Sequence, residues 1–216
     1  MLKVLVIKEL RESAGIVALA VIGAVYALGE LTATTVVPWQ ANRLYTYPFV
    51  GDWLSWYFWL LAGGLAIALG LRQTAWELGQ GTYLFLLHRP LPRGHVFGLK
   101  LLVGGVLVIV FGAGLILIYA SWAAAPGHID APFEWRMTTP AWILWIATPL
   151  IYLGAFLSGI RPARWFGTRL VPLVAAIGVA ALVSFMPWFW VALGISLIGA
   201  VIGLVSVSYF VRARDY

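Results

Sequence analysis

Most of the side chains that could do chemistry gather in one polar stretch between two long apolar runs, from Arg72 to Lys100. Nucleophilic catalysis needs a nucleophile beside a base, and metal-assisted catalysis needs several ligands around one ion. All three histidines lie between apolar runs and the chain has no cysteine. We therefore expect no catalytic residue, no metal site and no cofactor in this chain, and a polar stretch that contacts a soluble partner. Its ionisable members are Arg72, Glu77, His88, Arg89, Arg93, His95 and Lys100.

The same reasoning applies to nucleotides. A phosphate-binding loop reads G-x-x-x-x-G-K-[ST], because its backbone N–H groups and its lysine surround the phosphates. No segment of the sequence fits that pattern. If ATP drives this protein, another polypeptide binds ATP and Mg²⁺ and hydrolyses the nucleotide.

The elements that position the polar stretch are apolar helices. Hydrophobic residues make up 62% of the 216 residues and charged residues 10%, whereas about a quarter of the residues of soluble domains are charged. The sequence thus predicts an all-α integral membrane protein with a single transmembrane domain over residues 1–216. An amphipathic helix, 1–13, is expected on the membrane surface. Six spans of roughly one bilayer thickness follow at residues 14–31, 53–71, 99–122, 140–159, 170–186 and 188–211.

Basic residues predict the orientation of these spans. If the amino terminus is cytoplasmic, 12 of the 14 Lys and Arg residues lie on the inner side and only Arg43 and Arg136 lie outside. Such an asymmetry orients helical membrane proteins. We expect a multi-pass protein of the cell membrane, inner or plasma, with both termini in the cytoplasm. The inner residues are Lys3, Lys8, Arg11, Arg72, Arg89, Arg93, Lys100, Arg161, Arg164, Arg169, Arg212 and Arg214.

The interiors of the spans hold few groups for function. Ion-coupled transport uses ionisable side chains at membrane depth, and the interiors of the predicted runs lack them.

Gly199 and Gly203 form a G-x-x-x-G pair that lets two helix backbones approach, within one subunit or between two. The basic residues are spread between apolar segments, a pattern that indicates membrane topology and not a nucleic-acid surface. We therefore expect no nucleic-acid partner.

The polar stretch has an ordered series of features. An acidic residue near the end of the second span is followed by a Gly-containing turn, an apolar run with a proline, and a basic residue that opens the third span. In this series the chain resembles the permease subunits of ATP-binding-cassette transporters of the type-2, exporter-like family. The resemblance implies a cytoplasmic coupling helix between the second and third spans. The matching residues are Glu77, Gly81, Thr82, Tyr83, Leu84, Phe85, Leu86, Leu87, Arg89, Pro90, Arg93, Phe97 and Lys100.

The resemblance also implies partners and an activity. The chain would pair with an ATPase subunit and with a second permease subunit, identical or related, among membrane lipids, and would couple ATP hydrolysis to movement of an apolar or lipid-like substrate. From its composition, an apolar plug, residues 84–87, would enter a groove on the ATPase. Because a carboxylate near the carboxyl end of a helix is disfavoured, we expect a basic partner for Glu77, either Arg72 or, at a better position, Lys8, Arg11, Arg161, Arg164 or Arg169. One alternative is a non-transporting subunit that relays ATPase motion to other proteins or anchors them. A third is a small intramembrane enzyme.

Overall fold

The computed structural model describes residues 2–32, 48–49, 53–76, 93–128, 132–161 and 168–213. These residues form helices and short connections, with no strand among them. Five helical segments are long and apolar enough to cross a membrane. The prediction of an all-α membrane protein is therefore confirmed in outline. The predicted coupling residues between 77 and 92 lie outside the described part of the chain.

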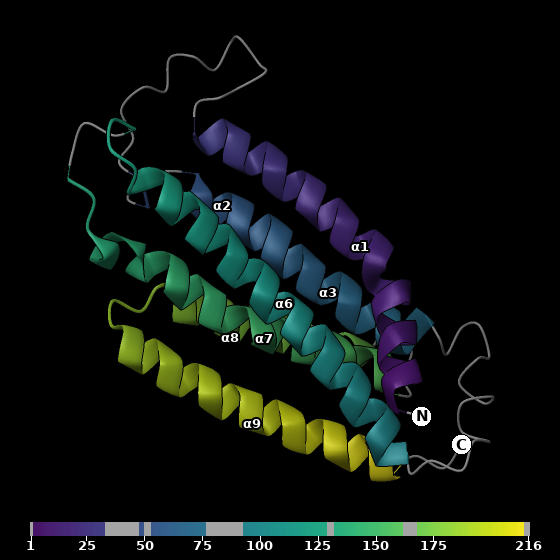
Figure 1. Ribbon diagram of the computed structural model, residues 1–216. Helices are drawn as coiled ribbons and strands as arrows, with labels where there is room; N and C mark the ends of the chain where they lie inside the picture. The colour runs from purple at the N-terminus through teal and green to yellow at the C-terminus, as the bar shows by residue number, and fades with distance from the viewer. Residues whose placement is uncertain are drawn as a thin grey trace.

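Helix α1, Leu2–Leu31, differs from its prediction. It is a single helix of 30 residues, so the expected boundary at Ser13 is not a helix end, although the first turns lie at an angle to the rest (Figure 1). The physical reason is that no proline or capping glycine stands between the amphipathic segment and the apolar run. One stripe of α1 faces the bundle, and it comprises Leu5, Glu9, Ser13, Ala20, Ala24 and Ala27.

The second segment runs without interruption from Leu54 to Trp76. It consists of α2 (Leu54–Phe58), a π-helical turn η2 (Trp59–Gly63), α3 (Gly64–Leu71) and a second π-helical turn η3 (Arg72–Trp76). A π turn holds an extra residue and re-aims the side chains that follow. The helix thus continues one turn beyond the predicted end at residue 71 and carries Gln73 and Thr74 into the protein interior.

Helix α6, Arg93–Ala123, is longer than predicted. It begins six residues before the expected start at residue 99, because the Arg93–Gly98 segment contains no residue that stops a helix. Lys100 consequently lies two turns inside α6, and Arg93 opens the helix.

Helix α7, Thr139–Ile160, follows a 3₁₀ turn, η4 (Trp135–Thr138), and agrees with its prediction to within one residue at each end. It contains Pro149, which cannot donate to the carbonyl of Trp145 four residues earlier. The Thr148 hydroxyl donates to that same carbonyl at 2.8 Å. This bond replaces the missing one and keeps α7 continuous.

The last two helices form a hairpin, α8 (Val171–Ser184) and α9 (Phe189–Ala213). The predicted fifth span, 170–186, is realised as a helix of 14 residues, about 21 Å long, against a hydrocarbon core of roughly 30 Å. It falls short of the length that the other five segments have. The predicted sixth span corresponds to α9, which extends two residues further.

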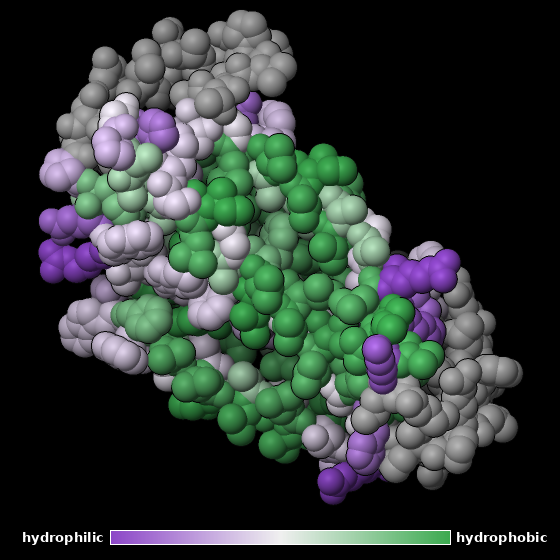
Figure 2. Space-filling model, viewed as in Figure 1, coloured by the Kyte–Doolittle hydropathy of each residue, from purple (hydrophilic) through white to green (hydrophobic). Residues whose placement is uncertain are grey.

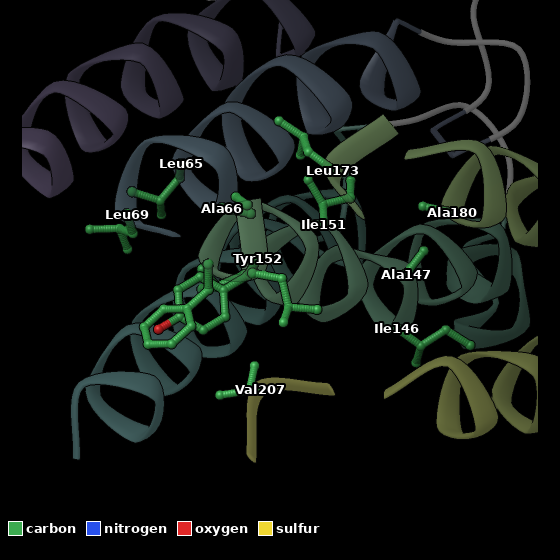
Figure 3. Packing of buried hydrophobic residues seen from close by; sticks show 14 of the residues in the cluster. Leu65, Ala66, Leu69, Ile146, Ala147, Ile151, Tyr152, Leu173, Ala180 and Val207 are labelled. Carbon is green, nitrogen blue, oxygen red and sulfur yellow. The ribbon is translucent and has the colours of Figure 1, made fainter. Parts of the chain in front are cut away.

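Helix α7 is the centre of the bundle, and α3, α6, α8 and α9 all pack on it. Figure 3 shows Ile146, Ala147, Ile151 and Tyr152 of α7 among buried side chains of the neighbouring helices. The predicted glycine pair of α9 lies in this packing: a Cβ at Gly199 would be 3.0 Å from Leu150, and one at Gly203 would be 3.2 Å from Leu153. In this chain both glycines therefore face α7.

Polar residues gather at the two ends of the molecule, with hydrophobic surface between them (Figure 2). At one end lie the start of α1, the end of η3, the start of α6, the α7–α8 junction and the end of α9 (Figure 1). We call it the basic end because these helix ends contain Lys3, Lys8, Arg11, Arg72, Lys100, Arg161, Arg169 and Arg212. Among the described residues, the Lys or Arg residue at the opposite end is Arg136, which lies beside Glu134.

Candidate functional site

A buried ion pair joins α1 to α6 at the basic end. Lys100 Nζ donates to Glu9 Oε1 at 2.8 Å, and the two side chains are 2% and 4% exposed. Desolvating two charges costs several kcal/mol per ion, which good geometry and further hydrogen bonds must offset. Removing one partner leaves the other charge buried, so the pair fixes α1 against α6 strongly.

Tyr152 of α7 lies beside this pair and joins two more segments to it. Its hydroxyl is 2.6 Å from Gln73 Oε1 in η3 and 3.2 Å from the Lys100 carbonyl oxygen in α6, and the Leu101 carbonyl lies at 3.3 Å. A phenol has one proton and can donate to one of these acceptors at a time. Tyr152 is 2% exposed, so this hydroxyl is a shared polar centre for three helices.

A close approach of α6 makes this centre possible. A Cβ at Gly104 would overlap the Tyr152 hydroxyl and would lie 2.5 Å from Gln73 Oε1. Glycine at position 104 therefore admits the phenol and the amide against the α6 backbone. We name the side chains of Glu9, Gln73, Lys100 and Tyr152, together with Gly104, the junction cluster.

A second set of bonds fixes the carboxyl end of α7. Arg169 donates to the carbonyl oxygens of Ser158 at 3.0 Å and Gly159 at 2.9 Å. These carbonyls belong to the last turn of the helix, where no intrahelical donor follows. The Ser158 hydroxyl in turn accepts from the Leu173 N–H at 3.1 Å, in the first turn of α8. The α7–α8 junction is thus closed by the side chains of Ser158 in α7 and Arg169 just before α8, and by a backbone N–H of α8.

Helix turn η3 packs directly on this closed junction. Gly159 has no side chain where the Thr74 hydroxyl lies, and a Cβ there would overlap it. Thr74 itself is buried and donates to the Gly70 carbonyl at 2.7 Å. Turn η3 is the last described element before residue 77, and α6 is the first after residue 92. Both flanks of the predicted coupling segment are therefore anchored in the bundle.

The structure places the remaining predicted site residues as follows. Lys100 was expected at a helix opening and is instead buried against Glu9, because α6 starts earlier than predicted. Arg93 opens α6. Lys8 is one of the proposed partners of Glu77. Its Nζ lies 3.5 Å from Glu12 Oε1, and both side chains are about one-third exposed. The other predicted coupling residues, all outside the described part of the chain, are Glu77, Gly81, Thr82, Tyr83, Leu84, Phe85, Leu86, Leu87, Arg89 and Pro90.

Glu9, Gln73 and Tyr152 were not among the predicted site residues. Glu9 lies in the segment 1–13, which was predicted as an amphipathic helix on the membrane surface. A signal for its burial exists in the sequence, since Leu5, Glu9 and Ser13 repeat every four residues and continue into the alanine stripe of α1. Tyr152 is a polar-tipped side chain in the middle of an apolar run, and such groups need a hydrogen-bond partner when buried.

The junction cluster is suited to a structural role. Among the described residues, no three His, Asp or Glu side chains lie close enough to hold a metal ion together. The junction cluster brings one carboxylate, one ammonium, one amide and one phenol into a protein interior, where each bond strengthens as water is excluded. What this arrangement can do is hold four segments in one register.

Comparisons with known proteins identify no family for this chain. The sequence matches no family model, and neither a curated protein nor a solved structure matches it.

Proposed function

We propose that the chain is the permease subunit of an ATP-binding-cassette transporter of the type-2, exporter-like family. It couples ATP hydrolysis by a separate ATPase to movement of an apolar or lipid-like substrate. It crosses the membrane six times with both termini in the cytoplasm, and it works as a dimer with itself or a related subunit. The polar stretch between the second and third spans is the contact for the ATPase.

The observation that carries the proposal is the anchoring of both flanks of that stretch. On the amino-terminal side, Thr74 and Gln73 of η3 contact Gly159 and Tyr152 of α7. On the carboxyl-terminal side, Lys100 ties α6 to Glu9 of α1. A force that reaches Trp76 or Arg93 therefore passes to α1 and α7 through buried polar contacts.

The surface of the helices supports a membrane setting for this machinery. Large apolar side chains are exposed along α1, α6 and α9, including Leu19, Ile22, Leu102, Val110, Ile198 and Val201. Exposed apolar area on this scale marks contact with lipid or with other membrane helices. Helix α8 has 14 residues, and a span shorter than the hydrocarbon core is accommodated by local thinning of the bilayer.

The alternative of a mechanical relay has one observation in its favour. The connection from Ser184 to Phe189 is short, so the α8–α9 hairpin has no external element of its own. A subunit that relays ATPase motion to another membrane protein needs the anchored flanks but needs no substrate path. An ATPase assay in the presence of candidate substrates separates the two, since substrate stimulates hydrolysis only in the transporter.

The direct test of the assignment is reconstitution. The chain and the ATPase of a neighbouring gene are purified together, inserted into lipid vesicles and assayed for ATP hydrolysis. We expect hydrolysis by the complex and none by the chain alone, because its sequence has no phosphate-binding loop. Robust hydrolysis by a preparation of the chain shown to be free of the ATPase overturns the assignment.

A further inference from the structure

Helices α6 and α9 converge at the basic end (Figure 1). Side chains of the two helices line a groove there. The groove has a volume of about 550 Å³, within the ~300–1,000 Å³ of small-molecule sites. Each helix contributes one face, with residues spaced three and four apart. The lining residues are Gly94, Phe97, Gly98 and Leu101 of α6 and Leu204, Val207, Ser208, Val211 and Arg212 of α9.

The walls of the groove are apolar along most of its length. Eight residues separate Leu204 from Arg212, which is about 12 Å along the helix axis. This length covers most of one leaflet of a hydrocarbon core roughly 30 Å thick. Phe97 and Val207 are buried, while Leu204 is 42% exposed at the deep end. The groove therefore has the length and the chemistry to hold an acyl chain.

The mouth of the groove is cationic. Arg212 carries the only charge among the described residues that line it, and it is exposed. The Ser208 hydroxyl, one turn deeper, donates to the Leu204 carbonyl at 2.9 Å and keeps its lone pairs free to accept. A guanidinium at the end of a membrane helix pairs readily with a phosphate, in two parallel hydrogen bonds.

The start of α6 adds to the positive potential at this mouth. Gly94 lies in the first turn of α6, where backbone N–H groups have no intrahelical acceptor and the helix dipole is positive. A Cβ at Gly94 or at Gly98 would meet no atom within 4 Å. Two glycines thus leave the α6 wall open beside Arg212, and a headgroup can reach the backbone there.

We propose that this groove binds a membrane phospholipid with an anionic headgroup, with its phosphate at Arg212 and one acyl chain between α6 and α9. The charge of the mouth and the apolar walls together select this occupant. A zwitterionic lipid offers the same chain but adds a cation that Arg212 repels. The site lies outside the junction cluster, and the proposal does not depend on the permease assignment, because it concerns the chain alone.

The test measures lipid retention by the purified chain. The protein in detergent is titrated with phosphatidylglycerol or phosphatidylcholine, and bound lipid is counted by native mass spectrometry. We expect phosphatidylglycerol to be retained about tenfold more tightly, since both lipids present a phosphate to Arg212 but only phosphatidylcholine adds a cation that the guanidinium repels. Arg212→Gln should remove the preference, whereas the matched control Lys3→Gln, an exposed base at the same end, should keep it.

A second variant tests the groove itself. Gly98→Leu puts a side chain into the groove between α6 and α9, at a position where the Cβ would meet no atom within 4 Å, and should lower retention of both lipids. Gly114→Leu, also open but further along α6, is its control and should change nothing. Equal retention of the two lipids, or retention unaffected by Arg212→Gln and Gly98→Leu, overturns the proposal.

Two other occupants give distinct results in the same experiment. Competition by millimolar inorganic phosphate that displaces the lipid fully would assign the mouth to a free anion and overturn the lipid site. A change of oligomeric state in Gly98→Leu with unchanged lipid retention would assign the groove to a second copy of the chain, and would also overturn it.

Discussion

Lys100 Nζ lies 2.8 Å from Glu9 Oε1, and both side chains are almost fully withdrawn from the surface. The two residues are 91 positions apart in the sequence. Their pairing joins the first turns of α1 to α6, the helix that follows the predicted contact segment for the ATPase in the sequence.

The first prediction concerns this ion pair. Lys100→Met leaves the Glu9 carboxylate buried without its ammonium partner, which should lower the free energy of unfolding by about 3–5 kcal/mol. Lys8→Met serves as the control, since the Lys8–Glu12 pair is about one-third exposed and surface pairs contribute only ~0–1 kcal/mol. Denaturant unfolding in detergent, followed by tryptophan fluorescence, measures both.

A double variant keeps this prediction testable if the single variant does not fold. Lys100→Met with Glu9→Leu removes both charges and should recover most of the lost stability, because apolar replacements of a buried pair are often neutral. The role of the pair is contradicted if the double variant is less stable than Lys100→Met alone.

The second prediction concerns the phenol of the junction cluster. Tyr152→Phe removes the hydroxyl that lies 2.6 Å from Gln73, and a buried acceptor left unpaired costs about 1–3 kcal/mol. Tyr26→Phe, at a position 57% exposed, should change the free energy of unfolding by less than about 0.5 kcal/mol. A double-mutant cycle of Tyr152→Phe with Gln73→Leu should give a coupling energy of about 0.5–3 kcal/mol. Strict additivity would show that the two side chains do not interact.

The third prediction concerns topology, for which α8 is decisive. Helix α8 has 14 residues, and if it crosses the membrane the carboxyl terminus returns to the side of the amino terminus. Reporter fusions at Tyr45 and Asp130 should report the outside, and a fusion at Tyr216 should report the cytoplasm, since most of the described basic residues belong to the helix ends that meet at the basic end. A Tyr216 reporter on the outside would mean that α8 does not cross.

The fourth prediction concerns Glu77. A carboxylate near the carboxyl end of a helix is disfavoured by about 0.3–1 kcal/mol when exposed, so we expect a basic partner to offset it. Glu77→Gln should leave membrane insertion and ATPase binding intact but reduce the function that hydrolysis drives. Wild-type function in the glutamine variant, measured in vesicles with the ATPase, is the contradicting result.

Much of the helical framework follows from the sequence. The apolar runs predict α7 to within one residue at each end, and Pro140 stands in its first turn. The predicted helix boundaries were wrong where no helix-breaking residue stands between a polar and an apolar segment. This is why α1 passes through Ser13 and α6 begins at Arg93.

The junction cluster could be predicted only in part. The four-residue repeat of Leu5, Glu9 and Ser13 indicates that Glu9 shares the buried stripe of α1. Its partner does not follow from any local pattern, because Lys100 meets it through the packing of two helices far apart in the chain. Gln73 is buried because η3 is a π turn. Such a turn contains one residue more than an α-helical turn, so a regular helical periodicity does not predict which side chains it buries.

The most direct test of the central claim is co-purification of the ATPase with variants of the apolar plug, residues 84–87. Phe85→Ala with Leu86→Ala should abolish co-purification, because the apolar centre of an interface carries most of its binding energy. The matched control, Leu117→Ala with Ile118→Ala on the exposed face of α6, should retain the ATPase as wild type does. Retention by the plug variant, or no ATPase bound to the wild-type chain, would contradict the account.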